Sequence, residues 1–237
     1  MFVKKHIISM VLIFMSQQVF CVDNSGGNSV YIDQTNADQS TVNITQTGSN
    51  NTLGDPDSLL APEFAIEGNT MLVDIVQDGM NNAITGNIVG GNTTADVTQT
   101  GNTNSTDITM GAMGTGSGTL SMTITGSNNT TDLNIGVTSN SSNYSNITDI
   151  TGDSNTLTSN IDSSYTDNSI VVTGDSNTIT TTQTGASGAA LITGHNIELS
   201  TIGDSNTITI LQDGLTNPNS AILNVTGSSA TVNLIQH

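Results

Sequence analysis

Three aspartates stand at the same place in a repeated phrase of this chain, and they are the first candidates for chemistry. Asp153, Asp175 and Asp204 each follow the glycine in the sequence Gly-Asp-Ser-Asn-Thr. Ca²⁺ accepts carboxylate and amide oxygens as ligands, so a weak calcium site is one interpretation. Solvated turn residues that slow premature aggregation are the other, and it is favoured because the Gly-Gly-x-Gly-x-Asp calcium repeat is absent.

Groups that could carry out catalysis are scarce in this chain. Beyond residue 21 there is no cysteine, lysine or arginine, and the histidines there are His195 and His237. An enzyme needs a general base or nucleophile and a group that stabilises developing negative charge. We therefore expect no enzymatic activity and no cofactor, apart from the weak calcium option.

The charge balance is strongly acidic and sets limits on partners. The chain has 20 Asp and Glu against 2 Lys and Arg, which gives a formal net charge of −18. A chain with no basic patch is unsuited to binding the phosphates of nucleic acid. We expect no nucleic-acid partner.

The N-terminal residues have the parts of a secretory signal peptide. Lys4 and Lys5 precede an apolar run over 7–15, and a polar break follows. The apolar run is shorter than the ~20 residues that span a bilayer. We expect residues 1–21 to be a signal peptide cleaved after Cys21, and the remaining chain to be secreted without stable membrane insertion.

Glycines recur along the rest of the chain on a regular spacing. Gly79, Gly90 and Gly101 are 11 residues apart, and Gly152 and Gly174 are 22 apart. Most of these glycines are followed three residues later by asparagine. We expect turn glycines at Gly48, Gly79, Gly101, Gly126, Gly152, Gly174, Gly185, Gly203 and Gly214. The companion asparagines are Asn51, Asn82, Asn104, Asn129, Asn155, Asn177, Asn206 and Asn217.

The residues around each turn alternate between apolar and polar. Before Gly79 the alternate positions are Met71, Val73, Ile75 and Gln77. This period of two predicts strands with one buried face. Two strands in a repeat of about 22 residues are typical of a solenoid with stacked coils, and the chain length allows roughly nine or ten coils. We expect an all-β solenoid domain over 22–237, with an irregular insertion loop at 54–70.

Glutamine recurs on the inward track, at or near two residues before a turn glycine. A buried amide without a partner costs about 1–3 kcal/mol, but stacked amides can donate to one neighbour and accept from the other. We expect two structural ladders, one of the companion asparagines and one of glutamines. The glutamines are Gln34, Gln46, Gln77, Gln99, Gln183, Gln212 and Gln236.

Several segments resemble curlin repeats, whose pattern is Ser-x5-Gln-x-Gly-x-x-Asn-x5-Gln. The segments 29–53, 95–110 and 230–237 carry the resemblance, and it is weaker between 111 and 170. The resemblance implies a secreted bacterial subunit that polymerises into amyloid-like, curli-type fibres of the biofilm matrix. It also implies surface adhesion and colonisation, a nucleator subunit and dedicated secretion machinery. The loss of Lys and Arg and the 54–70 segment depart from the family pattern.

The pattern at the two chain ends favours self-association. Strand-like alternation begins at Val30 and runs to Gln236, so the end strands would expose unpaired backbone that can template another chain. We expect copies to stack end to end into a homopolymer. The alternatives are an ice-binding solenoid that uses Thr-x-Thr arrays such as Thr178, Thr180 and Thr182, and a non-polymerising surface adhesin or virus-encoded appendage.

Overall fold

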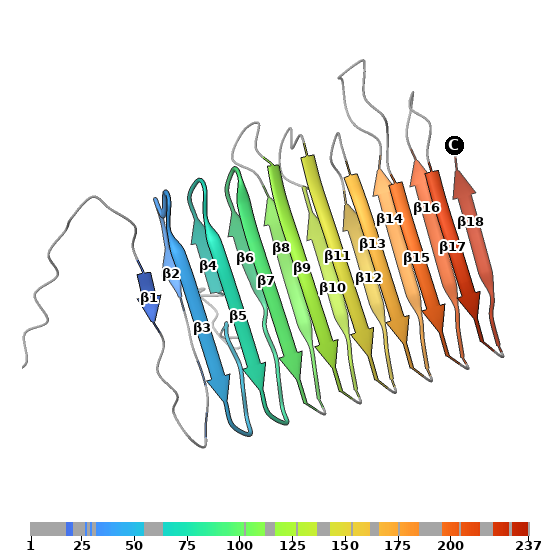
Figure 1. Cartoon of the computed structure of the whole chain (residues 1–237), viewed down its shortest axis with the longest axis horizontal. Helices are drawn as coiled ribbons and strands as arrows, with labels where there is room; N and C mark the ends of the chain where they lie inside the picture. The colour runs from blue at the N-terminus through green and yellow to red at the C-terminus, as the bar shows by residue number, and fades with distance from the viewer. Residues whose placement is uncertain are drawn as a thin grey trace, which may run out of the picture.

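The computed structural model shows two parallel sheets stacked face to face, joined at each end of their strands (Figure 1). It describes residues 18–20, 27, 29, 32–54, 64–101, 103–111, 117–126, 128–136, 143–152, 154–161, 166–174, 176–184, 196–203, 205–213, 220–227 and 229–236. Within them no residue is helical. The predicted β-solenoid is confirmed.

The odd-numbered strands form one sheet, called sheet A, and the even-numbered strands form sheet B. Sheet A contains β1 (Gln18–Phe20), β3 (Thr41–Thr47), β5 (Leu72–Asp78), β7 (Thr93–Thr100), β9 (Ser117–Thr125), β11 (Asn143–Thr151), β13 (Thr166–Thr173), β15 (Asn196–Ile202) and β17 (Ser220–Thr226). Sheet B contains β2 (Asp33–Gln34), β4 (Phe64–Glu67), β6 (Gly86–Val89), β8 (Thr106–Gly111), β10 (Thr131–Ile135), β12 (Leu157–Ile161), β14 (Ile179–Thr184), β16 (Ile208–Asp213) and β18 (Val232–Gln236).

Each strand pairs in parallel with the strand one coil before it and the strand one coil after it. Sheet A runs in the order β1-β3-β5-β7-β9-β11-β13-β15-β17, and sheet B runs in the matching order from β2 to β18. In the described residues each sheet therefore has nine strands. Each coil contributes one strand to each sheet, so these strands form nine coils. This number agrees with the expected nine or ten.

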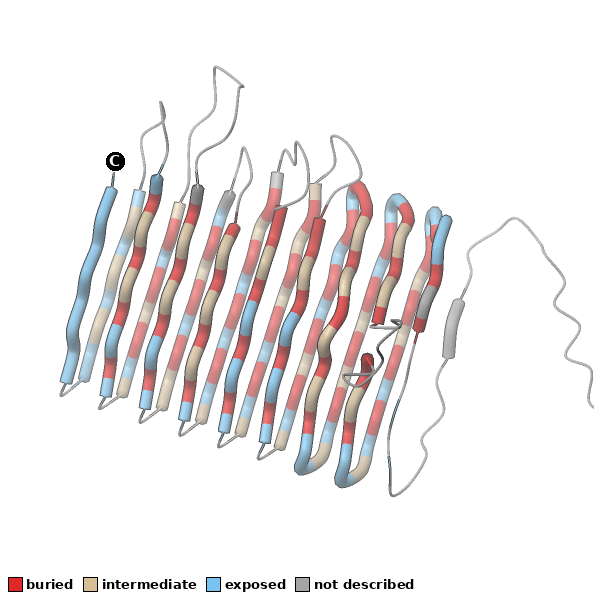
Figure 2. Tube along the Cα trace, turned by 180° about the vertical axis from the view of Figure 1, so that it is seen from behind, coloured by how far each residue is buried: buried red, intermediate tan, exposed pale blue. Residues whose placement is uncertain are grey.

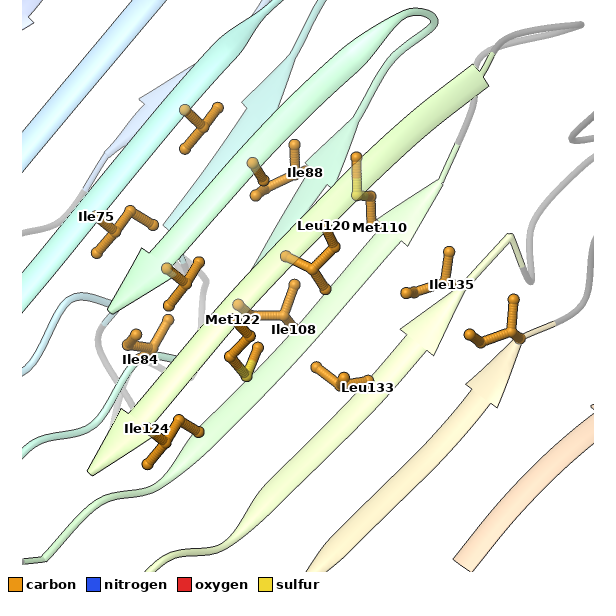
Figure 3. Close-up of a cluster of buried hydrophobic side chains, with 14 of the residues drawn as sticks. Ile75, Ile84, Ile88, Ile108, Met110, Leu120, Met122, Ile124, Leu133 and Ile135 are labelled. Carbon is orange, nitrogen blue, oxygen red and sulfur yellow. The ribbon is translucent and has the colours of Figure 1, made fainter. Parts of the chain in front are cut away.

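The core is a thin layer between the two sheets, formed by alternate residues of the strands from β3 to β16 (Figure 2). Most of its side chains are isoleucine, valine, leucine and methionine, and Ile75, Ile108 and Leu120 are fully buried. Figure 3 shows how these side chains from the two sheets lie together between the ribbons. Small and β-branched residues suit this thin layer because they pack well on a pleated surface. Their burial is the main stabilising term.

The coils are less uniform than the predicted repeat of about 22 residues. Equivalent asparagines are 22 residues apart between Asn82 and Asn104, but 31 apart between Asn51 and Asn82 and 29 apart between Asn177 and Asn206. The Gly-x-x-Asn turn keeps its four residues in each of these coils. Extra residues enter elsewhere, as in the eleven-residue connection 185–195 from β14 to β15.

The prediction that 54–70 forms an irregular loop is wrong for its last part. Residues 64–67 form β4, which pairs with both β2 and β6. Phe64 and Ile66 are buried while Ala65 and Glu67 are half-buried. The sequence of residues 64–67 does alternate between apolar and more polar positions, but the prolines and acidic residues before it indicated a loop. Residues 55–63 lie outside the described part.

The expected signal peptide contributes one described strand. β1 lies within residues 1–21 and pairs in parallel with β3, from Gln18 beside Thr41 to Phe20 beside Asn43. Its pairing covers three residues of the seven-residue β3. The first strand of sheet A is therefore a short one.

Candidate functional site

The turns from sheet A to sheet B are stacked so closely that only glycine fits at their first position. A Cβ atom added to Gly79 would lie 1.5 Å from the carbonyl oxygen of Gly48, and one added to Gly126 would lie 1.5 Å from that of Gly101. The amide of each turn glycine donates to the following coil, as from Gly101 to Thr125 at 2.9 Å. Close approach of stacked backbones, more than backbone torsion alone, therefore requires the glycines.

The asparagines of these turns form a continuous hydrogen-bonded ladder. The Nδ2 atom of each asparagine donates to the Oδ1 atom of the asparagine one coil earlier, over 2.5–2.8 Å. The bonds run from Asn82 to Asn51, Asn104 to Asn82, Asn129 to Asn104, Asn155 to Asn129, Asn177 to Asn155 and Asn206 to Asn177. The ladder thus joins seven of the eight expected asparagines, and Asn217 lies outside the described residues.

The ladder amides from Asn51 to Asn177 also close their own turns. Asn129 Nδ2 donates to the carbonyl oxygen of Gly126 at 3.0 Å, and Asn155 Nδ2 donates to that of Gly152 at 2.8 Å. These side chains are buried, yet their amide nitrogens have partners both along and across the stack. Because buried polar groups are costly only when unpaired, the ladder fixes the register of the coils without a penalty.

The asparagine ladder stops one coil before the C-terminal end of the stack. The last turn reads Gly-Ser-Ser-Ala, so Ala230 stands where the other coils have asparagine. The Oδ1 atom of Asn206 is buried and has no hydrogen-bond partner. The C-terminal coil, β17 and β18, is therefore joined to the stack without an asparagine rung.

Replacing Ala230 with asparagine is expected to stabilise the C-terminal coil. The new amide would donate to Asn206 Oδ1, and such a bond contributes about 0.5–1.5 kcal/mol. Amide hydrogen exchange across β17 and β18 is expected to slow, and the melting temperature to rise. Ser229→Asn, one residue earlier at an exposed position, is the matched control. Equal protection in both variants would contradict a continuing ladder.

The glutamines divide into two groups, and the first group differs from the expected ladder. Gln46, Gln77 and Gln99 are stacked in register on sheet A. Their Nε2 atoms, however, donate across the core to carbonyl oxygens of their own coil. The acceptors are Thr52 for Gln46, Ala83 for Gln77 and Ser105 for Gln99, the last at 3.2 Å. These glutamines hold the two halves of one coil together.

The second group of glutamines does form a ladder, on sheet B. Gln183 Nε2 donates to Gln212 Oε1 at 3.0 Å, and Gln212 Nε2 donates to Gln236 Oε1 at 3.4 Å. Gln34 lies apart from both groups, in β2, where it pairs with Ile66. Within the part of the chain that the structure describes, the glutamine ladder thus lies in the last three strands of sheet B.

One buried polar pair was not expected from the sequence. Asn146 Nδ2 donates to Asn168 Oδ1 at 2.9 Å, and Thr148 donates to Asn146 Oδ1 at 3.2 Å. The same inward track contains Tyr144, whose pKa is raised to about 12 by burial. The period of two could have identified these residues as inward-facing, because every second residue of β11 belongs to one face. These residues are Tyr144, Asn146, Thr148 and Ile150.

Some of the candidate residues lie outside the described part of the chain. These are Asp153, Asp175, Asp204, Gly185, Gly214, Asn217, His195 and His237. Among the described residues no group of three or more His, Cys, Asp or Glu side chains could hold a metal ion. The calcium interpretation therefore gains no support from the described side chains.

The threonines of the ice-binding alternative do not form a wide array. Thr180 pairs with Thr158 and Thr209, but Thr182 pairs with Asn160 and Leu211. A longer threonine column lies on the outer face of sheet A and contains Thr100, Thr125, Thr151 and Thr173 in successive coils. Asp78 and Ile202 interrupt this run, and Thr47 and Thr226 lie beyond them in the same column. The column is regular, but its neighbouring column contains Asp149 and Val171.

Comparison with known proteins does not place this chain in a family. No protein-family model, curated protein or solved structure matches it. In the described part of the chain, no helix has the length and apolar character needed to cross a membrane. The fold defines the protein as a β-solenoid with an interior asparagine ladder.

Proposed function

We propose that this protein is a secreted structural subunit whose copies stack end to end into extracellular, curli-like fibres. The observation that carries the proposal is the open C-terminal end of the solenoid. Val232 and Leu234 point to the inner side of sheet B but are 49% and 39% exposed, whereas their partners Ile208 and Ile210 are fully buried. Figure 2 shows this terminal strand as exposed along its whole length.

An open sheet end is the feature that lets one chain template another. Among the described strands, β17 and β18 are the last of their sheets, so each presents one row of backbone groups to which no described strand is bonded. Proteins that remain monomeric cover such ends with polar caps. Here two of the exposed inward residues, Val232 and Leu234, are apolar, and a second copy would bury them.

The sequence resemblance to curlin repeats supports the same role. It extends the proposal to a biofilm matrix fibre, to surface adhesion and to partners that nucleate and export the subunit. The alternatives predict different behaviour: an adhesin or appendage subunit that does not polymerise remains monomeric, and an ice-binding protein produces thermal hysteresis. The outer threonine column is the one feature that favours the ice-binding alternative.

Fibre growth by the purified protein tests the proposal, with the chain used both complete and without residues 1–21. We expect a lag phase that added fibre seeds abolish, parallel cross-β spacing near 4.8 Å, and thioflavin binding. Monomer that persists without dye binding under all conditions would contradict the proposal.

Growth is expected to accelerate with salt. The chain carries a net charge of −18, so stacked copies repel one another, and 0.15 M salt screens exposed charges beyond about 8 Å. We expect the elongation rate to rise several-fold between about 10 and about 150 mM NaCl, because salt screens the repulsion between like-charged copies. Seeded elongation at fixed protein concentration measures the effect. A rate independent of salt would contradict contact between acidic copies.

A further inference from the structure

One inward column of sheet B begins and ends with glutamine. In β2 the column contains Gln34, which pairs with Ile66. It then passes through Ile88, Met110 and Ile135 to Ile161. Because Asn160 pairs with Thr182, the next residue of the column is Gln183, followed by Gln212 and Gln236. The apolar middle of this column separates a single glutamine at one end from three at the other.

The glutamine ladder at the C-terminal end has a direction. Gln183 donates to Gln212, and Gln212 donates to Gln236. Each amide nitrogen therefore points toward the C-terminal coil, and the amide nitrogen of Gln236 is the next donor in the series. A glutamine oxygen in the same column of a following strand would continue the ladder.

A neighbouring column offers a matching apolar contact. Leu234 pairs with Ile210, and it is 39% exposed because β18 is the edge strand of sheet B among the described residues. At the other end of sheet B, Ile32 lies two residues before Gln34, on the same face, and its carbonyl oxygen accepts from the Ala65 amide. Leu234 and Ile32 thus occupy the two ends of one inward column, as Gln236 and Gln34 do for the glutamine column. The middle of this column contains the polar Ser159 and Thr181 between Leu133 and Ile210.

We propose that the first strand of sheet B in a second copy docks on β18 in the register that places Gln34 beside Gln236 and Ile32 beside Leu234. The inference rests on the proposed end-to-end stacking and specifies its contact. A slip of one residue would turn the side chains to the wrong face. A slip of two residues would bury the Gln236 amide against Ile32.

At this contact the glutamines supply the polar side chains that can fix the register of the two strands. The asparagine ladder does not reach the C-terminal end, because Ala230 interrupts it after Asn206. Gln34 and Gln236 both lie outside residues 1–21. Both glutamines of the proposed contact are therefore present whether or not the expected signal peptide is removed.

Disulfide trapping between two copies tests the register. In the full chain with Cys21→Ser, one protein carries Gln34→Cys and another carries Gln236→Cys. Neighbouring parallel strands lie about 4.8 Å apart, within the Cα separation of about 4.4–6.8 Å that a disulfide requires. We expect a covalent heterodimer when the two proteins are mixed under fibre-growth conditions and oxidised.

Two further pairs complete the trapping experiment. Asn233→Cys lies on the opposite face of β18, and we expect it not to link to Gln34→Cys. A link between Gln236→Cys and Ile66→Cys would mean that β18 displaces β2 and pairs with β4, which overturns the proposal. Fibres that grow without the expected link would also overturn the register and leave the proposed function standing. If the wild-type chain never forms fibres, that result would instead contradict the proposed function.

The rate of seeded elongation in methionine variants tests the amide contact between the two glutamines. Methionine has nearly the length of glutamine but cannot continue the ladder. Gln236→Met and Gln34→Met are each expected to slow seeded elongation about tenfold, since each leaves a buried amide without its partner. The double variant is expected to recover part of the rate because two apolar side chains then meet. A cooperative melting transition in each variant verifies folding, and wild-type rates in both single variants would overturn the proposal.

Discussion

Gly126→Ala is expected to lower the free energy of unfolding by about 3 kcal/mol or more. The new Cβ would lie 1.5 Å from the carbonyl oxygen of Gly101 and 2.5 Å from Asn104 Oδ1. Both neighbours belong to a hydrogen-bonded stack, so neither can move away without breaking bonds on its other side. Urea denaturation followed by circular dichroism measures the loss.

Gly27→Ala is the matched control for this substitution. A Cβ at Gly27 would meet nothing within 4 Å, so the same chemical change should leave stability within about 0.5 kcal/mol of wild type. A similar small effect in both variants would show that the turns can separate. The close stacking of the coils would then not be what selects glycine.

Asn129→Asp is expected to destabilise the stack at neutral pH by about 3–5 kcal/mol. Asn129 Nδ2 donates both to Asn104 Oδ1 and to the Gly126 carbonyl, and Asn155 donates to its Oδ1. A carboxylate of the same shape can still accept from Asn155 but can no longer donate. It would place a buried negative charge against two carbonyl-type oxygens.

Acid is expected to reverse part of this loss. The carboxyl group introduced at position 129 has a higher pKa in the folded chain than in the unfolded chain, because the charged form is buried beside oxygens. The folded state then binds the proton more tightly, so the stability deficit shrinks as the pH falls below that folded pKa. Thermal melts of the variant and the wild type between pH 7 and pH 3 measure the difference.

Asn224→Asp separates this effect from a general effect of added charge. Asn224 is exposed on the outer face of β17, beside Ser200. It receives the same substitution without belonging to the ladder. Equal destabilisation of both variants would mean that net charge, rather than the interior ladder, controls stability.

Much of this fold follows from local patterns that repeat along the chain. The period of two in segments such as 71–77 predicts a strand with one buried face, because successive side chains of a strand point to opposite sides. The Gly-x-x-Asn spacing predicts stacked turns, because each coil presents the same residues to the next. The asparagine ladder from Asn51 to Asn206 could be predicted for the same reason.

The partners of the sheet A glutamines could not be predicted in this way. A buried glutamine can donate to a stacked neighbour or to a carbonyl across the core, and both choices satisfy the amide. Gln99 donates to the Ser105 carbonyl and accepts from the Thr106 hydroxyl at 2.5 Å. In all three coils the acceptor carbonyl lies six residues after the glutamine, beyond the Gly-x-x-Asn turn.

The sequence by itself determined the inward and outward faces, the turn glycines and the repeating coil, since each is a property of a few adjacent residues. Only the tertiary structure decided which residues share a column, because coils of 22 to 31 residues shift the register by amounts that depend on each connection. Gln34 and Gln236 are about 200 residues apart in the chain. They occupy the two ends of one column because strand pairing, unlike sequence distance, is set by backbone hydrogen bonds between neighbouring coils.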